Sequence, residues 1–208
     1  MYLSQRGVSL FLSLIALLVM TLGSVALIRS IDSGSLMIGN LGFKQSATIG
    51  ADRGVETAIT WLQANQSNLL DTNNTANGYY ATNLEGLDIT GNAAGSSTRI
   101  IIDWNNNNCS SDSKQYGGCI DPKPSNDVNG NSITYLISRL CKTQESINSG
   151  TNSCVKSNTS SSESAKRGEL KYNEDKRFSG TSTPYYRIIV RAQGPRNTVS
   201  YTETIVHF

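Results

Sequence analysis

The hydrophobic and polar positions divide the chain into an apolar N-terminal run, an amphipathic stretch and a long polar remainder with short apolar segments. Residues 8–28 contain no charged side chain, and Arg29 closes the run. The hydrocarbon core of a bilayer, about 30 Å thick, needs roughly 20 apolar helical residues, and an arginine at its centre costs about 3 kcal/mol. The pattern therefore predicts a membrane-spanning helix over residues 8–28.

The helix is expected to continue beyond Arg29, because apolar residues recur there at intervals of three and four. These positions are Leu41, Ala51, Val55, Ala58, Ile59 and Leu62. Such spacing is typical of one helix face, and a helix over residues 8–63 would be roughly 85 Å long at 1.5 Å per residue. Its apolar stripe needs a domain to cover it.

Five glycines interrupt the predicted helix, at positions 34, 39, 42, 50 and 54. Each weakens an exposed helix by about 1 kcal/mol relative to alanine. Residues 34–42 are therefore the segment that we expect to bend or melt when the chain packs with neighbours.

After residue 65 the pattern changes to short β-rich runs separated by turn residues. Strands are predicted over residues 99–104, 132–140, 185–192 and 199–206. The last two are joined across residues 193–197, a turn-rich linker of hairpin length. In the third run one face carries Tyr186, Ile188, Val190 and Ala192, and the other carries Arg187 and Arg191. We expect the first face to cover the helix and the second to face water, which gives an α+β fold with an antiparallel sheet.

Composition limits the possible functions. The formal net charge is only +2, and 16% of the 208 residues are charged, so charge indicates neither nucleic acid nor an acidic substrate. The remaining polarity comes from Asn, Ser, Thr and Gly, which suits exposed loops of an exported protein. After the helix, residues 66–208 are enough for one domain of ordinary size with its own core.

All four cysteines follow the predicted membrane span, so an oxidising compartment can pair them. Three pairings are possible. We favour Cys109 with Cys119 and Cys141 with Cys154, because each pair closes a short polar loop, and a loop of that size contributes about 3 kcal/mol in the chain-entropy account. Zinc is the alternative, but zinc-binding cysteines usually come in pairs two to four residues apart.

Few residues suggest catalysis or metal binding. The single histidine, His207, precedes the last residue, where it is expected to be exposed on a strand end without companion ligands. Residues 127–131 resemble a calcium loop but lack the glycine position and the glutamate of an EF-hand, so a plain turn is preferred. Trp61 and Trp104 suit a sugar-binding pair, but core packing is favoured because tryptophan buries so much area. We expect no enzyme, no cofactor and no metal site.

Three interpretations compete for the N-terminus. A cleaved secretory signal has a shorter apolar core, of 7–15 residues, and a small-residue cleavage site, whereas the apolar run here is longer and the amphipathic pattern continues without a polar gap into Ile31. A plain single-span anchor accounts for the apolar run but leaves Gly7 unexplained. The third is the type III signal of type IV pilins, and Arg6, Gly7 and Val8 resemble its cleavage site.

The resemblance extends along the chain to Met20-Thr21-Leu22, Arg29-Ser30, Gly39-Asn40-Leu41 and the C-terminal segment over residues 186–198, which contains Gly194-Pro195-Arg196-Asn197-Thr198. Together these segments resemble the PilX-like minor type IV pilins. The resemblance implies a leader over residues 1–7, cleavage between Gly7 and Val8, methylation of the new amine, and a pilin fold with residues 8–28 in the membrane and 29–65 in the exported part of the helix.

Leu12 departs from the common pilin pattern. It is the fifth residue of the processed chain, where most pilins carry a glutamate that is thought to neutralise the N-terminal ammonium of the subunit above. A buried carboxylate without that partner would be strongly penalised. Leucine at this position therefore favours a subunit with nothing above it, at an initiating or tip position.

The resemblance implies a non-enzymatic subunit that helps prime or cap a pilus and serves pilus biogenesis, twitching motility and adhesion. Its expected partners are other minor pilins, the major pilin, the prepilin peptidase and the inner-membrane assembly platform, and its expected location is the bacterial inner membrane and then the fibre. Two alternatives stay open: a minor pseudopilin of type II secretion, and a single-pass membrane receptor or adhesin.

Overall fold

A computed structural model describes residues 8–66, 70–158 and 182–208. Its first element is helix α1, Val8–Ala64, which covers 57 residues without a break. The predicted helix is therefore confirmed to within one residue at its end, and it continues through all five glycines. The chain forms two compact units, Met1–Gln45 and Ser46–Phe208, and α1 contributes to both.

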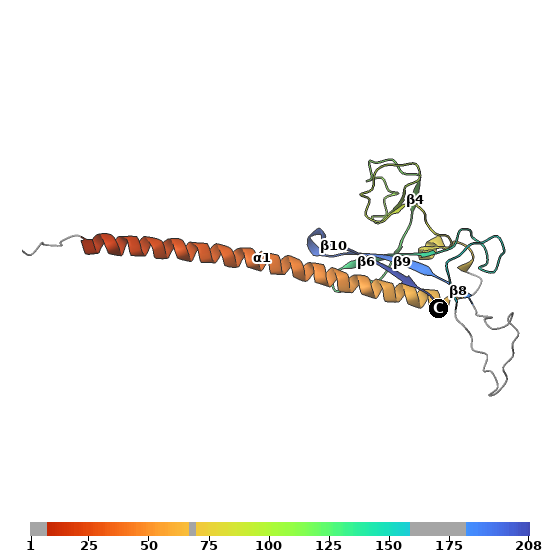
Figure 1. Ribbon diagram of the computed structural model, residues 1–208, viewed down its shortest axis with the longest axis horizontal. Helices are drawn as coiled ribbons and strands as arrows, with labels where there is room; N and C mark the ends of the chain where they lie inside the picture. Colours follow the sequence, from red (N-terminus) through yellow and green to blue (C-terminus); the bar gives the residue numbers. More distant parts are fainter. Residues whose placement is uncertain (1–7, 67–69, 159–181) are drawn as a thin grey trace, which may run out of the picture. The chain divides into compact units, whose positions relative to one another are not determined.

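The larger sheet of the second unit contains the long strands β6, β9 and β10 (Figure 1). Its order is β1-β6-β9-β10, from Tyr79–Tyr80, Ser132–Arg139, Tyr186–Gln193 and Val199–Val206. β6, β9 and β10 are antiparallel neighbours, and β5, Lys123–Pro124, shares the other edge of β6 with β1. The three long strands match the predicted ones. β1 was not predicted, and it pairs with β6 in parallel.

The last part of α1 packs against one face of this sheet. The buried helix side chains are Ala47, Ala51, Val55, Ala58 and Leu62, and they form one cluster with Ile133, Tyr135, Ile137, Tyr186, Ile188, Val190 and Ala192. The predicted stripe is thus confirmed from Ala51 onward, and so is the predicted inward face of β9. Leu41 is an exception, because its side chain is 64% exposed.

Two of the five glycines serve this packing. An added Cβ at Gly54 would lie 2.6 Å from Val190 Cγ1 and 2.7 Å from Ile133 Cγ2, and one at Gly50 would lie 3.0 Å from Ile133 Cδ1. Both glycines are buried. They let the sheet approach the helix closely, a packing role that the sequence pattern did not predict.

The opposite face of the large sheet, which the alternation predicts to face water, is covered in part: Arg191 is buried there, while Ile205 of β10 is exposed on the same face. A small parallel sheet of β2, Leu87–Asp88, β3, Ile100–Ile102, and β4, Gly118–Ile120, lies over it. Buried Tyr80, Ile102, Leu136 and Ile189 form a second core there. The predicted strand at residues 99–104 therefore belongs to this second sheet, because its isoleucines need burial that the helix-covered face does not offer.

The remaining elements are short. β7, Lys156–Asn158, pairs with β8, Ser182–Pro184, and 3-10 turns lie at Thr75–Asn77 and Pro195–Asn197. Residues 127–131 form the predicted turn. Val128 and Asn131 pair across it, with φ of 53° at Asn129 and 77° at Gly130, the positive values that a two-residue type I′ hairpin requires.

Candidate functional site

The first candidate region is the N-terminal half of α1. Gly7 lies outside the described residues, and Val8 is the first residue of the helix. Over the described residues, α1 is the one helix that is long and apolar enough to cross a membrane, with a mean hydropathy of 2.5 in its most apolar stretch. The side chains in that stretch are exposed, Leu12 among them at 61%. Such a surface needs lipid or neighbouring helices to cover it.

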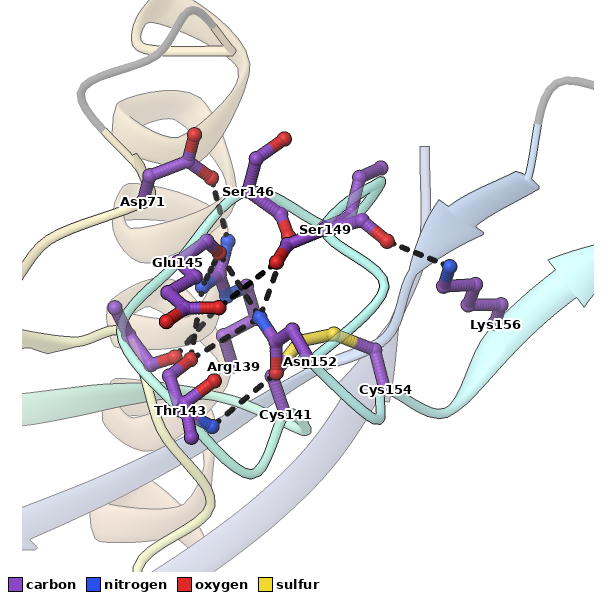
Figure 2. The surroundings of a disulfide bond; sticks show 12 residues. Asp71, Arg139, Cys141, Thr143, Glu145, Ser146, Ser149, Asn152, Cys154 and Lys156 are labelled. Atoms are coloured by element: carbon purple, nitrogen blue, oxygen red, sulfur yellow. Dashed lines mark hydrogen bonds and ion pairs between the residues drawn. A yellow bond between two sulfur atoms is a disulfide. The ribbon is translucent and has the colours of Figure 1, made fainter.

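The second candidate region is the loop closed by Cys141 and Cys154, which the structure joins in a disulfide (Figure 2). Arg139 is the last residue of β6, and its side chain enters this loop. Its guanidinium donates to the carbonyl oxygens of Ala81 at 3.1 Å and Glu145 at 2.6 Å, and to Asp71 Oδ1 at 2.8 Å. Figure 2 shows Asp71 and Glu145 on either side of this guanidinium group.

Asn152 holds the same loop from the inside. Its amide group donates to the carbonyl oxygens of Thr143 and Glu145, and its Oδ1 accepts from the Thr143 N–H at 3.2 Å. At the rim, Thr151 and Ser149 donate to the Glu145 carboxylate, and these hydrogen bonds lower its pKa. The loop is therefore a pre-organised polar surface rather than a loose turn.

The third candidate region is the loop closed by Cys109 and Cys119, the second disulfide. The structure thus contains the two pairs favoured by loop length. Beside this loop, buried Arg99 donates from Nε to Asp88 at 2.8 Å and from Nη2 to Asp112 at 2.5 Å. Lys114 Nζ donates to the carbonyl oxygens of three consecutive residues, Gly91, Asn92 and Ala93.

These contacts perturb the pKa values of the carboxylates. Burial by itself would raise the pKa of Asp88, but hydrogen bonds from Arg99 and from the backbone amides of Ala93 and Gly91 outweigh it, so the pKa is lowered. The hydrogen bond from Arg99 likewise lowers the pKa of Asp112 and raises that of Arg99. Both aspartates therefore stay charged well into the acid range.

A cavity of about 150 Å³ opens between this loop and the large sheet. Asp103, Trp104 and Asn105 line it from the chain after β3, and Arg191 and Tyr201 line it from β9 and β10. The rings of Trp104 and Tyr201 lie with their centres 5.9 Å apart and their planes tilted by 57°. Asp103 and Arg191 are both buried there.

The two tryptophans and the histidine considered as functional residues lie in packing contacts. Trp61 packs against the helix-side core with its ring 5.5 Å from that of Tyr79, which confirms the core prediction, and Trp104 packs against the second core while its ring borders the cavity. His207 is exposed just after β10, with its ring 5.0 Å from that of Tyr185. Among residues 8–66, 70–158 and 182–208, no three His, Cys, Asp or Glu side chains gather as a metal site would require.

Three arginines that the sequence pattern did not assign to the interior are buried: Arg99, Arg139 and Arg191. A signal was present for Arg139, because it shares the alternation of Ile133, Tyr135 and Ile137 and so had to lie on the buried face of its strand. The alternation placed Arg191 on the face of the large sheet that was expected to face water. The small sheet lies over this part of the face, so Arg191 is buried. Nothing in the sequence pattern pointed to the partners of Arg99, which come from strand β2 and from the Cys109–Cys119 loop.

Comparisons of this chain with protein-family models, curated proteins and solved structures found no match. Its class is therefore defined here by its α+β architecture, in which a long N-terminal helix, apolar and exposed in its first half, packs in its last part against a C-terminal sheet.

Proposed function

We propose that the chain is a minor type IV pilin, a non-enzymatic subunit that primes or caps pilus assembly. The proposal rests on the difference between the first and the last part of α1. Its first stretch is uncharged and exposed over residues 8–28, while its last turns are buried under a mostly antiparallel sheet. A pilin needs such a helix, because the same apolar surface first sits in the bilayer and later packs against helices of other subunits.

Leu12 supports an initiating or tip position. No acidic side chain lies between Val8 and Ile28, so this subunit has no carboxylate to neutralise the N-terminal ammonium of a subunit above it. A glutamate buried without that cation would be penalised by a few kcal/mol. The amine of Val8, freed by processing, still meets the acid of a subunit added beneath.

The pilin proposal also implies where the protein is located and which proteins it contacts. The precursor would sit in the inner membrane with residues 66–208 in the periplasm, where both disulfides form. The prepilin peptidase would cut it, and the assembly platform would pass it to the other minor pilins and the major pilin. Pilus biogenesis, twitching motility and adhesion are the processes that would depend on it.

A pseudopilin of type II secretion is the second candidate, and Leu12 favours it equally, because tip pseudopilins also lack the acid. Assays of twitching and of protein secretion separate the two candidates. Loss of the chain should abolish twitching and surface pili in a pilus system, while leaving secretion of exoproteins intact. The reverse pattern would assign it to secretion.

N-terminal processing tests the class itself. Mass spectrometry of the mature protein should find Val8 as the first residue, carrying a methylated amine, and Gly7→Ala should leave the precursor uncut in the membrane. A matched control is Gly23→Ala, which lies in the same apolar run, where an added Cβ meets nothing within 4 Å. A mature protein that starts at Met1 contradicts the pilin proposal and leaves the single-pass receptor or adhesin, and a protein that is cut beyond Ile28 contradicts the pilin proposal as well.

A further inference from the structure

The cavity beside Trp104 has walls that are fixed in place. The Trp104 indole N–H donates to the Ile89 carbonyl oxygen at 2.8 Å. Asp103 accepts the backbone N–H groups of Asn107 and Asn108 at 2.9 and 2.6 Å. A ligand would therefore meet groups that are already ordered, which lowers the entropic cost of binding.

The loop that carries this wall also holds an unusual backbone. Asn106, Asn108 and Cys109 have φ values of 52°, 55° and 56°, a region that non-glycine residues seldom adopt. The Cys109–Cys119 disulfide closes the loop at this point. Strained conformations of this kind persist where the surroundings fix them, and they cluster at binding sites.

Arg191 is the second unusual group. It is 9% exposed, and its Nη atoms donate to neutral acceptors, the Trp104 carbonyl, Asn105 Oδ1 and Gln193 Oε1. Within the part of the chain that the structure describes, no carboxylate forms an ion pair with it, and its Nε atom has no hydrogen-bond partner. The Nη1 atom of Arg191 fixes the Trp104 carbonyl group and the Asn105 side chain in the cavity wall.

The balance of charge indicates a neutral ligand. Asp88, Asp103 and Asp112 line the cavity together with Arg191. Arg99 and Lys114 stand directly behind it and bond Asp88, Asp112 and the Gly91 carbonyl. Three negative and three positive groups thus offset one another, and a ligand with a full charge of either sign gains little. Hydroxyl groups, which both donate and accept, match walls that hold both kinds of partner.

The aromatic pair and the volume of the cavity narrow the choice of ligand further. Trp104 and Tyr201, whose rings are tilted by 57° to one another, offer ring surface to the C–H groups of a ligand. A partly open cavity of about 150 Å³, close to the volume at which another protein encloses benzene, admits part of one substituted six-membered ring and leaves its outer substituents in solvent. We propose that this cavity binds one neutral sugar ring, the terminal hexose of a glycan.

The test uses the full chain in a zwitterionic detergent without a sugar headgroup. The protein has two tryptophans, so Trp61→Phe leaves Trp104 as the only tryptophan reporter. Free glucose, galactose and mannose are titrated to about 100 mM, well above the millimolar range expected for a single weak contact. At least one hexose should change the Trp104 fluorescence in a saturable way, while glucuronate should bind no more tightly.

Variants on β10 locate the site. Tyr201→Ala should raise the Kd about tenfold through loss of the aromatic contact, and Tyr201→Phe, which keeps the ring, should change it by less than about threefold. Ile205→Ala is the matched control, because Ile205 is exposed on the same face of β10 and does not line the cavity. It should leave the Kd unchanged.

Three results would overturn the proposal: no saturable response to any neutral hexose, a Kd that Tyr201→Ala leaves unchanged in a folded variant, or tighter binding of glucuronate than of glucose. If Tyr201→Ala fails to fold, the titration of the Trp61→Phe protein still decides, because its only tryptophan borders the cavity. The test is independent of the proposed pilin role, because an isolated subunit is measured and processing or assembly does not enter.

Discussion

Single residues decide how closely helix and sheet approach one another. Glycine is a poor helix former, yet Gly54 is buried between Val190 and Ile133. Gly42, in the same helix, would meet nothing within 4 Å if a Cβ were added. Identical residues in one helix thus have opposite physical roles, and only their tertiary neighbours distinguish them.

We predict that Gly54→Ala destabilises the protein by about 1–3 kcal/mol, because the added methyl group overpacks the core against two β-branched side chains. Gly42→Ala should be neutral or stabilise the helix by up to about 1 kcal/mol. Denaturant unfolding monitored by near-ultraviolet circular dichroism measures both. Equal stability of the two variants would contradict the packing role of Gly54.

Leu12 gives the second prediction at this scale. Leu12→Glu should give no gain in piliation and should impair assembly, because a glutamate with no cation above it must stay protonated or cost on the order of 3 kcal/mol in the membrane. Pilus counts measure the effect, with Leu12→Ile as the apolar control. Normal piliation with the variant spread along the fibre would remove the tip position and leave the pilin proposal standing.

At the scale of elements, each disulfide organises a loop around a buried arginine. Cys141–Cys154 closes the loop that Arg139 and Asn152 fill, and Cys109–Cys119 closes the loop whose Asp112 pairs with Arg99. The covalent bond and the polar network support each other. Loss of either disulfide should therefore release its loop and also expose the buried arginine beside it to solvent.

Replacing either pair by serines should lower the free energy of unfolding by about 2–5 kcal/mol. Loss of Cys109–Cys119 should also weaken hexose binding, whereas loss of Cys141–Cys154 should not, because only the first loop lines the cavity. Chemical denaturation and the Trp104 titration check the two halves, and non-reducing peptide mapping checks the pairing. A link between Cys119 and Cys141 would contradict the structure.

At the scale of the whole molecule, stability should depend on acid through the Arg99 cluster. The pKa values of Asp88 and Asp112 are lowered in the folded protein. A carboxylate of this kind stabilises the fold fully above its unfolded pKa, about 3.9, and this contribution is lost as the pH falls from there through the lower folded pKa. The free energy of unfolding should therefore hold steady from neutral pH to about pH 4 and then decline.

Denaturant midpoints between pH 7 and pH 2 measure this decline. Asp112→Asn should be less stable at neutral pH and should lose less on acidification, because one of the two linked carboxylates is gone. Asp127→Asn is the control, since Asp127 is exposed in the hairpin turn, and it should follow the unaltered protein. Parallel curves for all three proteins would contradict the role of Asp112.

Much of this architecture is determined locally. An uncharged run followed by three- and four-residue spacing predicts α1 because helix periodicity needs no distant partner, and alternation predicts β6, β9 and β10 for the same reason. The turn over residues 193–197 follows from its glycine and proline, and the disulfide pairs agree with their short loops.

Only the tertiary structure decides what covers the second face of the large sheet. β2, β3 and β4 are two or three residues long and pair in parallel, so their partners are distant in sequence and leave no periodic signal. The burial of Arg191, the two carboxylate partners of Arg99 and the cavity beside Trp104 follow from that second layer. A single sequence specifies which side chains alternate, whereas the side on which they are buried depends on long-range packing.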